Sequence, residues 1–151
     1  VNKMLDSPTF TQKVKTDYWQ MTTVFVMLIY IVIGTMVIVM VPEEPYVPYI
    51  FFGFALISAI ASFFRSKTID RYFEQGEVIT ATIEKIRLFS RYPFFLVNYQ
   101  HYNEHYTRKI YVVRNKQAKE YKIGDTIKIL ILTDNPKKAI IFSFYEQEKA
   151  H

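Results

Sequence analysis

The sequence predicts an α+β membrane protein, in which a two-helix transmembrane hairpin is followed by a small β-rich domain of about five strands with a barrel-like form. Three observations predict this class. Two long segments near the N-terminus contain no charged residue, prolines interrupt the short connection between them, and apolar residues alternate with polar ones from Gly76 onward. Charge-free segments of this length are typical of membrane helices, and the alternation is typical of strands.

The two expected membrane spans cover residues 18–42 and 45–64. A helix rises about 1.5 Å per residue, so the spans reach about 37 and 30 Å, against a hydrocarbon core of about 30 Å. Pro42, Pro45 and Pro48 interrupt their connection. Because this connection is so short, the two helices are expected to form an antiparallel hairpin over residues 18–64. No amphipathic segment elsewhere in the chain could bury two helices that are apolar all round.

The charges around the hairpin predict its orientation. The loop between the spans carries Glu43 and Glu44, whereas six basic residues flank the spans on the other side, namely Lys3, Lys13, Lys15, Arg65, Lys67 and Arg71. Because cytoplasmic flanks are enriched in Lys and Arg, both termini are expected in the cytoplasm. Residues 1–17 then form a cytoplasmic juxtamembrane segment, 65–75 a helical connector, and 76–151 a cytoplasmic β-domain with a short C-terminal tail.

A short amphipathic helix is expected before the first span. Ser7 precedes a proline, as an N-cap residue often does, and Phe10, Val14 and Tyr18 recur at four-residue spacing. The second helix is expected to continue beyond the membrane and to end near Gly76.

Small residues at helical spacing mark one face of the second span. Ala55, Ala59 and Ser62 follow one another at intervals of four and three residues. Such a stripe permits close approach of a second helix. The first helix of the hairpin is the simpler partner, and another copy of the chain in a homo-oligomer is the alternative.

Five segments of the β-domain have the composition of strands, and they cover residues 77–86, 93–100, 106–113, 126–133 and 138–145. Residues 102–105 are expected to form a hairpin tip and residues 134–136 a turn. Residues 114–122 lose the alternation and suit a short helix or a turn.

The chain resembles a bacterial membrane-protein family of unknown function. The resemblance rests on two apolar helices, a G-E-V-I-T-A-T-I segment, a Y-x-x-G-D-T-I-K-I-L segment and a final D-N-P-x-x-A turn, with matching residues Gly76, Val78, Ala81, Tyr99, Tyr106, Tyr121, Gly124, Asp125, Asp134, Asn135, Pro136 and Ala139. It implies a compact β-domain and the inner membrane of a bacterial cell, and it supplies no catalytic residue.

The sequence favours a non-enzymatic role with no metal and no cofactor. It contains no cysteine, so a thiolate metal site and a cysteine nucleophile are excluded. Phosphate-binding glycine loops and the common hydrolase motifs are also missing. His101, Glu104 and His105 come nearest to a ligand cluster, but their position at the expected hairpin tip favours ordinary polar residues.

The net charge of +5 favours anionic partners. Membrane lipids and a second membrane or cytoplasmic protein are the expected partners, and the basic residues expected to face them are Arg108, Lys109, Arg114, Lys137 and Lys138. Nucleic acid is a less favoured partner, because the many tyrosines of the β-domain suit core positions and cross-strand pairs.

Two functions fit these features. The first is a membrane-anchored protein-interaction or regulatory module that acts through its basic cytoplasmic β-domain. The alternative is an immunity-type or accessory membrane protein, whose hairpin binds a toxin, a channel or an export component. The two functions differ in which half of the chain contacts the partner.

The predicted topology can be tested with single introduced cysteines. A cysteine in place of Glu44 should react with a membrane-impermeant thiol reagent in intact cells, whereas cysteines in place of Thr9 and Asn115 should be protected. Labelling at position 115 together with protection at position 44 would reverse the orientation.

Overall fold

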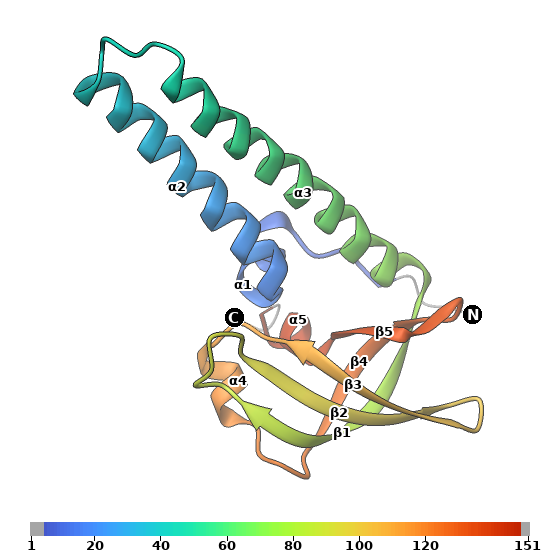
Figure 1. The fold of residues 1–151 in the computed structure, drawn as a ribbon. Coiled ribbons are helices and arrows are strands. Elements are labelled where there is room, and N and C mark those ends of the chain that lie inside the picture. The colour runs from blue at the N-terminus through green and yellow to red at the C-terminus, as the bar shows by residue number, and fades with distance from the viewer. Residues whose placement is uncertain (1–4, 149–151) are drawn as a thin grey trace.

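The computed structural model describes residues 5–148 and shows a long helical hairpin standing on a small sheet (Figure 1). A short helix, α1 (Phe10–Thr16), precedes the two long antiparallel helices α2 (Tyr18–Met40) and α3 (Val47–Gln75). Both are long and apolar enough to cross a membrane. Lys3 of the expected basic flank and the last three residues of the expected C-terminal tail lie outside the described residues.

The helix boundaries follow from capping chemistry. Thr9 is the N-cap of α1, and the expectation of Ser7 at this position is wrong. The Thr9 hydroxyl accepts a hydrogen bond from the Gln12 N–H, while the Gln12 side chain accepts one from the Thr9 N–H. Ser7 has no such reciprocal partner, because Phe10 stands three residues after it. Asp17 then interrupts the helices with extended backbone and caps α2 by accepting a hydrogen bond from the Gln20 N–H at 2.8 Å.

Helix α3 joins the second expected span and the expected connector into one uninterrupted helix of 29 residues. Pro48 lies in its first turn, where a missing N–H removes no helical hydrogen bond. The helix ends at Gly76, and the chain passes directly into the first strand. A Cβ atom at position 76 would overlap the carbonyl oxygen of Tyr72, so only glycine fits this junction.

The sheet is antiparallel and nearly closes into a barrel. Its strands are β1 (Gly76–Arg87), β2 (Phe94–His101), β3 (Glu104–Tyr111), β4 (Thr126–Leu132) and β5 (Asn135–Ile141), in the spatial order β3-β2-β1-β4-β5. The central strand β1 pairs with β4 along its first part and with β2 along its second part. Tyr102 and Asn103, both with positive φ, form the two-residue turn between β2 and β3. The short helix α4 (Lys116–Glu120) precedes β4.

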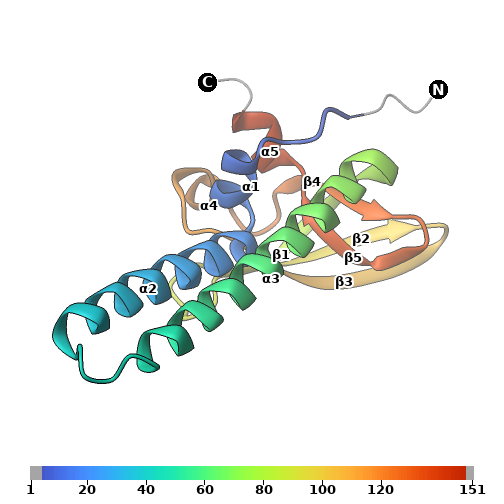
Figure 2. The ribbon, with the colours of Figure 1, turned by 90° about the horizontal axis from the view of Figure 1, so that it is seen from above.

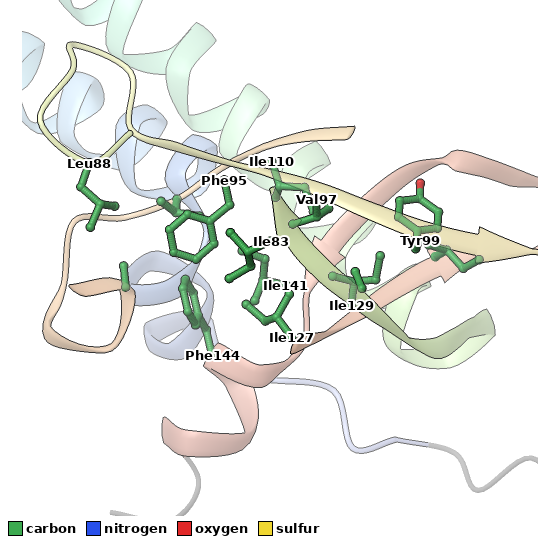
Figure 3. Close-up of a cluster of buried hydrophobic side chains, with 14 residues drawn as sticks. Ile83, Leu88, Phe95, Val97, Tyr99, Ile110, Ile127, Ile129, Ile141 and Phe144 are labelled. Carbon is green, nitrogen blue, oxygen red and sulfur yellow. The ribbon is translucent and has the colours of Figure 1, made fainter. Parts of the chain in front are cut away.

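The expectation of a last strand reaching residue 145 is wrong, because β5 ends at Ile141 and α5 (Ser143–Glu148) follows it. The Ser143 hydroxyl accepts the Lys128 N–H at 3.0 Å and so ends the strand pairing. Phe144 packs beside Phe95 inside the sheet (Figure 3). Phe142 and Tyr145 instead pack on Phe73 of α3, outside the sheet. Strand geometry would have placed Phe142 and Phe144 on the same face.

Two hydrophobic cores result from this arrangement. The first fills the interior of the sheet, and Figure 3 shows its main side chains, including Ile83, Val97 and Ile127. The second lies outside the sheet, between the end of α3 and the strands β4 and β5. Helix α3 contributes Ile69, Tyr72 and Phe73, and the residues packed against them are Leu130, Leu132, Ile140, Phe142 and Tyr145. Helix α1 packs beside α5 at the base of the hairpin (Figure 2). The hairpin and the sheet therefore share a core.

The second core generates a stability prediction. Phe73→Ala removes a buried ring from between α3 and the sheet, and truncation of a buried phenylalanine costs about 3–5 kcal/mol. We expect the full chain in detergent to unfold at a clearly lower temperature, followed by circular dichroism. Phe63→Ala, which truncates an exposed ring about three turns earlier on α3, is the matched control and should change the melting temperature little. Equal effects of the two substitutions would contradict the shared core.

Candidate functional site

Polar contacts fix the base of the hairpin above the sheet. The Lys13 ammonium of α1 pairs with Asp70 of α3 at 2.7 Å and donates to the Ser66 hydroxyl at 2.9 Å. The Arg65 guanidinium of α3 donates to the Asp17 carboxylate, with 3.0 Å between Nε and Oδ1. Buried charges are stable in such a place only when they are paired and hydrogen-bonded. The pairs therefore set the register of α1, α2 and α3.

The small-residue stripe lies within this hairpin. Ala55 and Ser62 are buried and Ala59 is half-buried. The Ser62 hydroxyl accepts a hydrogen bond from the fully buried Gln20 side-chain amide of α2 at 2.7 Å. At Gly34 of α2, an added Cβ atom would lie within 3.1–3.3 Å of phenylalanine side chains of α3. Ser62 thus contacts α2, and the packing role of Ala55 and Ala59, in the hairpin or in a homo-oligomer, stays a prediction.

A cavity of about 220 Å³ opens where the sheet fails to close. Strands β3 and β5 stand at the two ends of the strand order and form opposite walls of this cavity. Asp17, Trp19 and Arg65 at the base of the hairpin contribute to the lining, and Phe144 and Tyr145 of α5 complete it. We call this space the seam cavity.

Four of the five predicted basic residues line the seam cavity. Arg108 and Lys109 come from β3, and Lys137 and Lys138 come from the start of β5. None of the four forms an ion pair with the residues that the structure describes. Among residues 5–148, the lining contains one carboxylate, that of Asp17, which is already bound to Arg65. The described lining therefore carries more basic than acidic side chains.

One buried polar atom of a cavity-lining residue, Nε of Arg108, has no hydrogen-bond partner within the described chain. Arg108 stands opposite Val97, a fully buried residue, so its side chain lies on the inner face of the sheet at the open edge. The Tyr145 hydroxyl lies beside the Thr16 side chain, and burial raises the pKa of this hydroxyl.

Aromatic rings surround one side of the cavity. The ring centroids of Tyr18, Trp19 and Tyr111 lie 5.4–5.9 Å apart, which joins the start of α2 to the end of β3. The Lys109 ammonium lies 4.1 Å from the Phe94 ring centroid and 5.0 Å from that of Tyr111. These rings join the start of the apolar hairpin to the wall of the cavity.

Arg114, the fifth predicted basic residue, lies elsewhere. Its guanidinium donates to the carbonyl oxygens of Leu88 at 2.7 Å and Ser90 at 3.3 Å, and it covers the Phe89 ring. These contacts hold the loop between β1 and β2. Arg114 thus has a structural partner and does not line the cavity.

The two histidines of the predicted hairpin tip point to opposite sides of the sheet. His101 is buried, with Nδ1 3.9 Å from Glu77, whereas His105 is exposed and stands opposite Gln100. Within residues 5–148, no group of three potential metal-ligating side chains comes together.

The sequence alone did not indicate the contributions of Asp17 and Tyr145. Asp17 is the last residue of the expected juxtamembrane segment, and Tyr145 the last residue of the expected final strand. One available signal was that Asp17 stands three residues before Gln20, a spacing at which aspartate often caps a helix.

Comparisons of the chain with protein-family models, with curated proteins and with solved structures found no match. The resemblance to a bacterial membrane-protein family therefore stays a prediction.

The Asp17–Arg65 pair generates a third prediction. Asp17→Ala removes both the α2 cap and a buried ionic partner, and we expect the free energy of unfolding of the full chain in detergent to fall by about 2–4 kcal/mol. Asp17→Asn keeps a capping oxygen, so we expect it to lower the free energy of unfolding by less than Asp17→Ala does. Asp134→Asn breaks the exposed pair with Arg71 and should cost less than about 1 kcal/mol. If Asp134→Asn lowered the free energy of unfolding as much as Asp17→Ala, the Asp17–Arg65 pair would contribute no more to stability than an exposed ion pair.

Proposed function

We propose that this chain is a membrane-anchored interaction and regulatory module that acts through its basic β-domain. In this proposal α2 and the first part of α3 cross the inner membrane of a bacterial cell as a two-pass hairpin, and both termini lie in the cytoplasm. The 23 residues of α2 reach about 35 Å, enough to span with some tilt. The basic residues at the base of the hairpin and the acidic loop at its tip support this orientation.

The observation that carries the proposal is the rigid joint between the hairpin and the sheet. Paired charges connect α1 and α2 to α3, and α3 shares a hydrophobic core with β4 and β5. A domain on a flexible tether would sample many orientations. Here the joint holds the sheet in one orientation, so its basic seam would lie beside the inner leaflet, where anionic partners are concentrated.

The lining of the seam cavity favours binding over catalysis. It offers guanidinium and ammonium groups, a protonated tyrosine and aromatic rings, all of which recognise anions or apolar groups. Its one carboxylate is engaged with Arg65 and is not available as a general base.

A swap of the membrane anchor tests which half of the chain contacts the partner. Residues 21–61 would be replaced by an unrelated two-helix anchor of equal length, which retains Gln20, Ser62 and the joint below them. A photo-crosslinking amino acid would stand at Thr133, beside the start of β5, or at Leu56, exposed on α3. The measurement is the set of protein adducts formed in living cells.

We expect the adducts at position 133 to survive the swap and to disappear with Lys137→Glu and Lys138→Glu together. Lys116→Glu with Lys119→Glu, on the exposed side of α4, is the matched control and should leave them unchanged. Adducts that form in the unswapped chain at position 56 and not at position 133 would contradict the proposal. They would instead support the alternative of an immunity-type or accessory protein that acts through its hairpin.

A further inference from the structure

We propose that the seam cavity binds a single phosphate group, and that the favoured source of this group is the headgroup of an anionic phospholipid. This inference rests on the proposed function, because it places the cavity beside the inner leaflet. It goes further in naming the chemical class of the ligand and the residues that hold it.

Charge is the first argument. Arg108 and Lys109 of β3 and Lys137 and Lys138 of β5 all contribute to the lining, and within the described chain no carboxylate pairs with them. Arg108 lies on the inner face of the sheet, whereas Lys109 lies on the outer face with its ammonium over the Phe94 and Tyr111 rings. Like charges in a partly enclosed space repel one another more strongly than in open water, and a phosphate bound to Arg108 offsets this repulsion.

A buried hydrogen-bond donor is the second argument. The buried Nε of Arg108 has no partner within residues 5–148, although buried polar groups are nearly always hydrogen-bonded. This N–H can donate, and Arg108 lines the cavity. A phosphate supplies the acceptor oxygen that this donor needs, and arginine binds phosphate oxygens especially well.

Size and position identify the source of the phosphate. At about 220 Å³ the cavity is smaller than the roughly 300–1,000 Å³ of pockets that enclose a whole small molecule. It holds a phosphate with a short polar extension and leaves the rest of the ligand outside. Trp19 lines the cavity and is 45% exposed at the start of the apolar hairpin. A phospholipid matches this layout, with its headgroup in the cavity and its acyl chains along α2.

Trp19 is the one tryptophan of the chain and lies in the cavity wall, so its fluorescence reports directly on occupancy. The full chain in a neutral detergent would be titrated with short-chain phosphatidylglycerol, short-chain phosphatidylcholine, glycerol 3-phosphate and inorganic phosphate. We expect a saturable change with phosphatidylglycerol at a concentration about tenfold or more below that needed with phosphatidylcholine. Added salt should weaken the binding.

Two sets of variants test the residues that hold the phosphate. Arg108→Gln should weaken phosphatidylglycerol binding by about tenfold or more, because one charged hydrogen bond is worth at least that factor. Lys137→Gln with Lys138→Gln, both exposed and outside the cores, should also weaken it without lowering the melting temperature. Lys116→Gln with Lys119→Gln is the control and should leave binding unchanged.

The soluble ligands separate the two sources of phosphate. Saturation by phosphatidylglycerol alone supports the lipid source, whereas saturation by glycerol 3-phosphate at a similar concentration supports the same phosphate site with a soluble ligand. Equal responses to both lipids, or phosphatidylglycerol binding that neither Arg108→Gln nor the double lysine variant weakens, would overturn the site. If the titration shows no phosphate site while the adducts at position 133 persist, the proposed interaction module is supported and only the phosphate site is rejected. If the adducts at position 133 do not form while the titration succeeds, the interaction module is rejected and the phosphate site is supported.

Discussion

Three helices and one edge of the sheet meet at the ion pair between Asp17 and Arg65. Asp17 ends α1, caps α2, forms an isolated bridge with Val112 just beyond β3, and receives the Arg65 guanidinium from α3. A buried carboxylate that loses its cation is strongly destabilising, so this contact tolerates little movement of any of its four partners. The positions of the hairpin, the seam and the aromatic rings around it all depend on this contact.

The same contact lies at one end of the opening in the sheet. For the barrel to close, β5 would have to pair with the free edge of β3. The bridge of Asp17 to Val112 occupies the end of that edge, and the bend of the chain into α5 at Ser143 ends β5 nearby. The gap is therefore bounded by the base of the hairpin, and Arg108 projects into it from a position that a closed barrel would assign to the core.

Much of this fold could be predicted from local sequence patterns. The absence of charge defined α2 and the first part of α3, and alternation located four of the five strands within a few residues. The end of β5 was missed because the segment 138–145 has the composition of a strand, whereas the Lys128 N–H that binds Ser143 and the space beside Phe95 favour a helix. Those determinants come from distant parts of the chain, which local patterns do not report.

The cavity could be predicted only in part, for a similar reason. The basic residues were evident from composition, but their convergence depends on which strands form the open edges of the sheet. Arg114 has the same charge as Arg108, yet it binds the carbonyl oxygens of Leu88 and Ser90. The difference follows from position in the sheet and not from residue type.

The glycine junction between α3 and β1 couples the orientation of the hairpin to that of the sheet. Helix α3 passes into the central strand of the sheet at Gly76 with no intervening loop, so the two elements share one continuous backbone. A hairpin that tilts to match a thinner bilayer would rotate the whole sheet through this junction. Bilayer thickness would then set the angle between the basic seam and the lipid surface. The orientation of the β-domain would therefore respond to the thickness of the membrane.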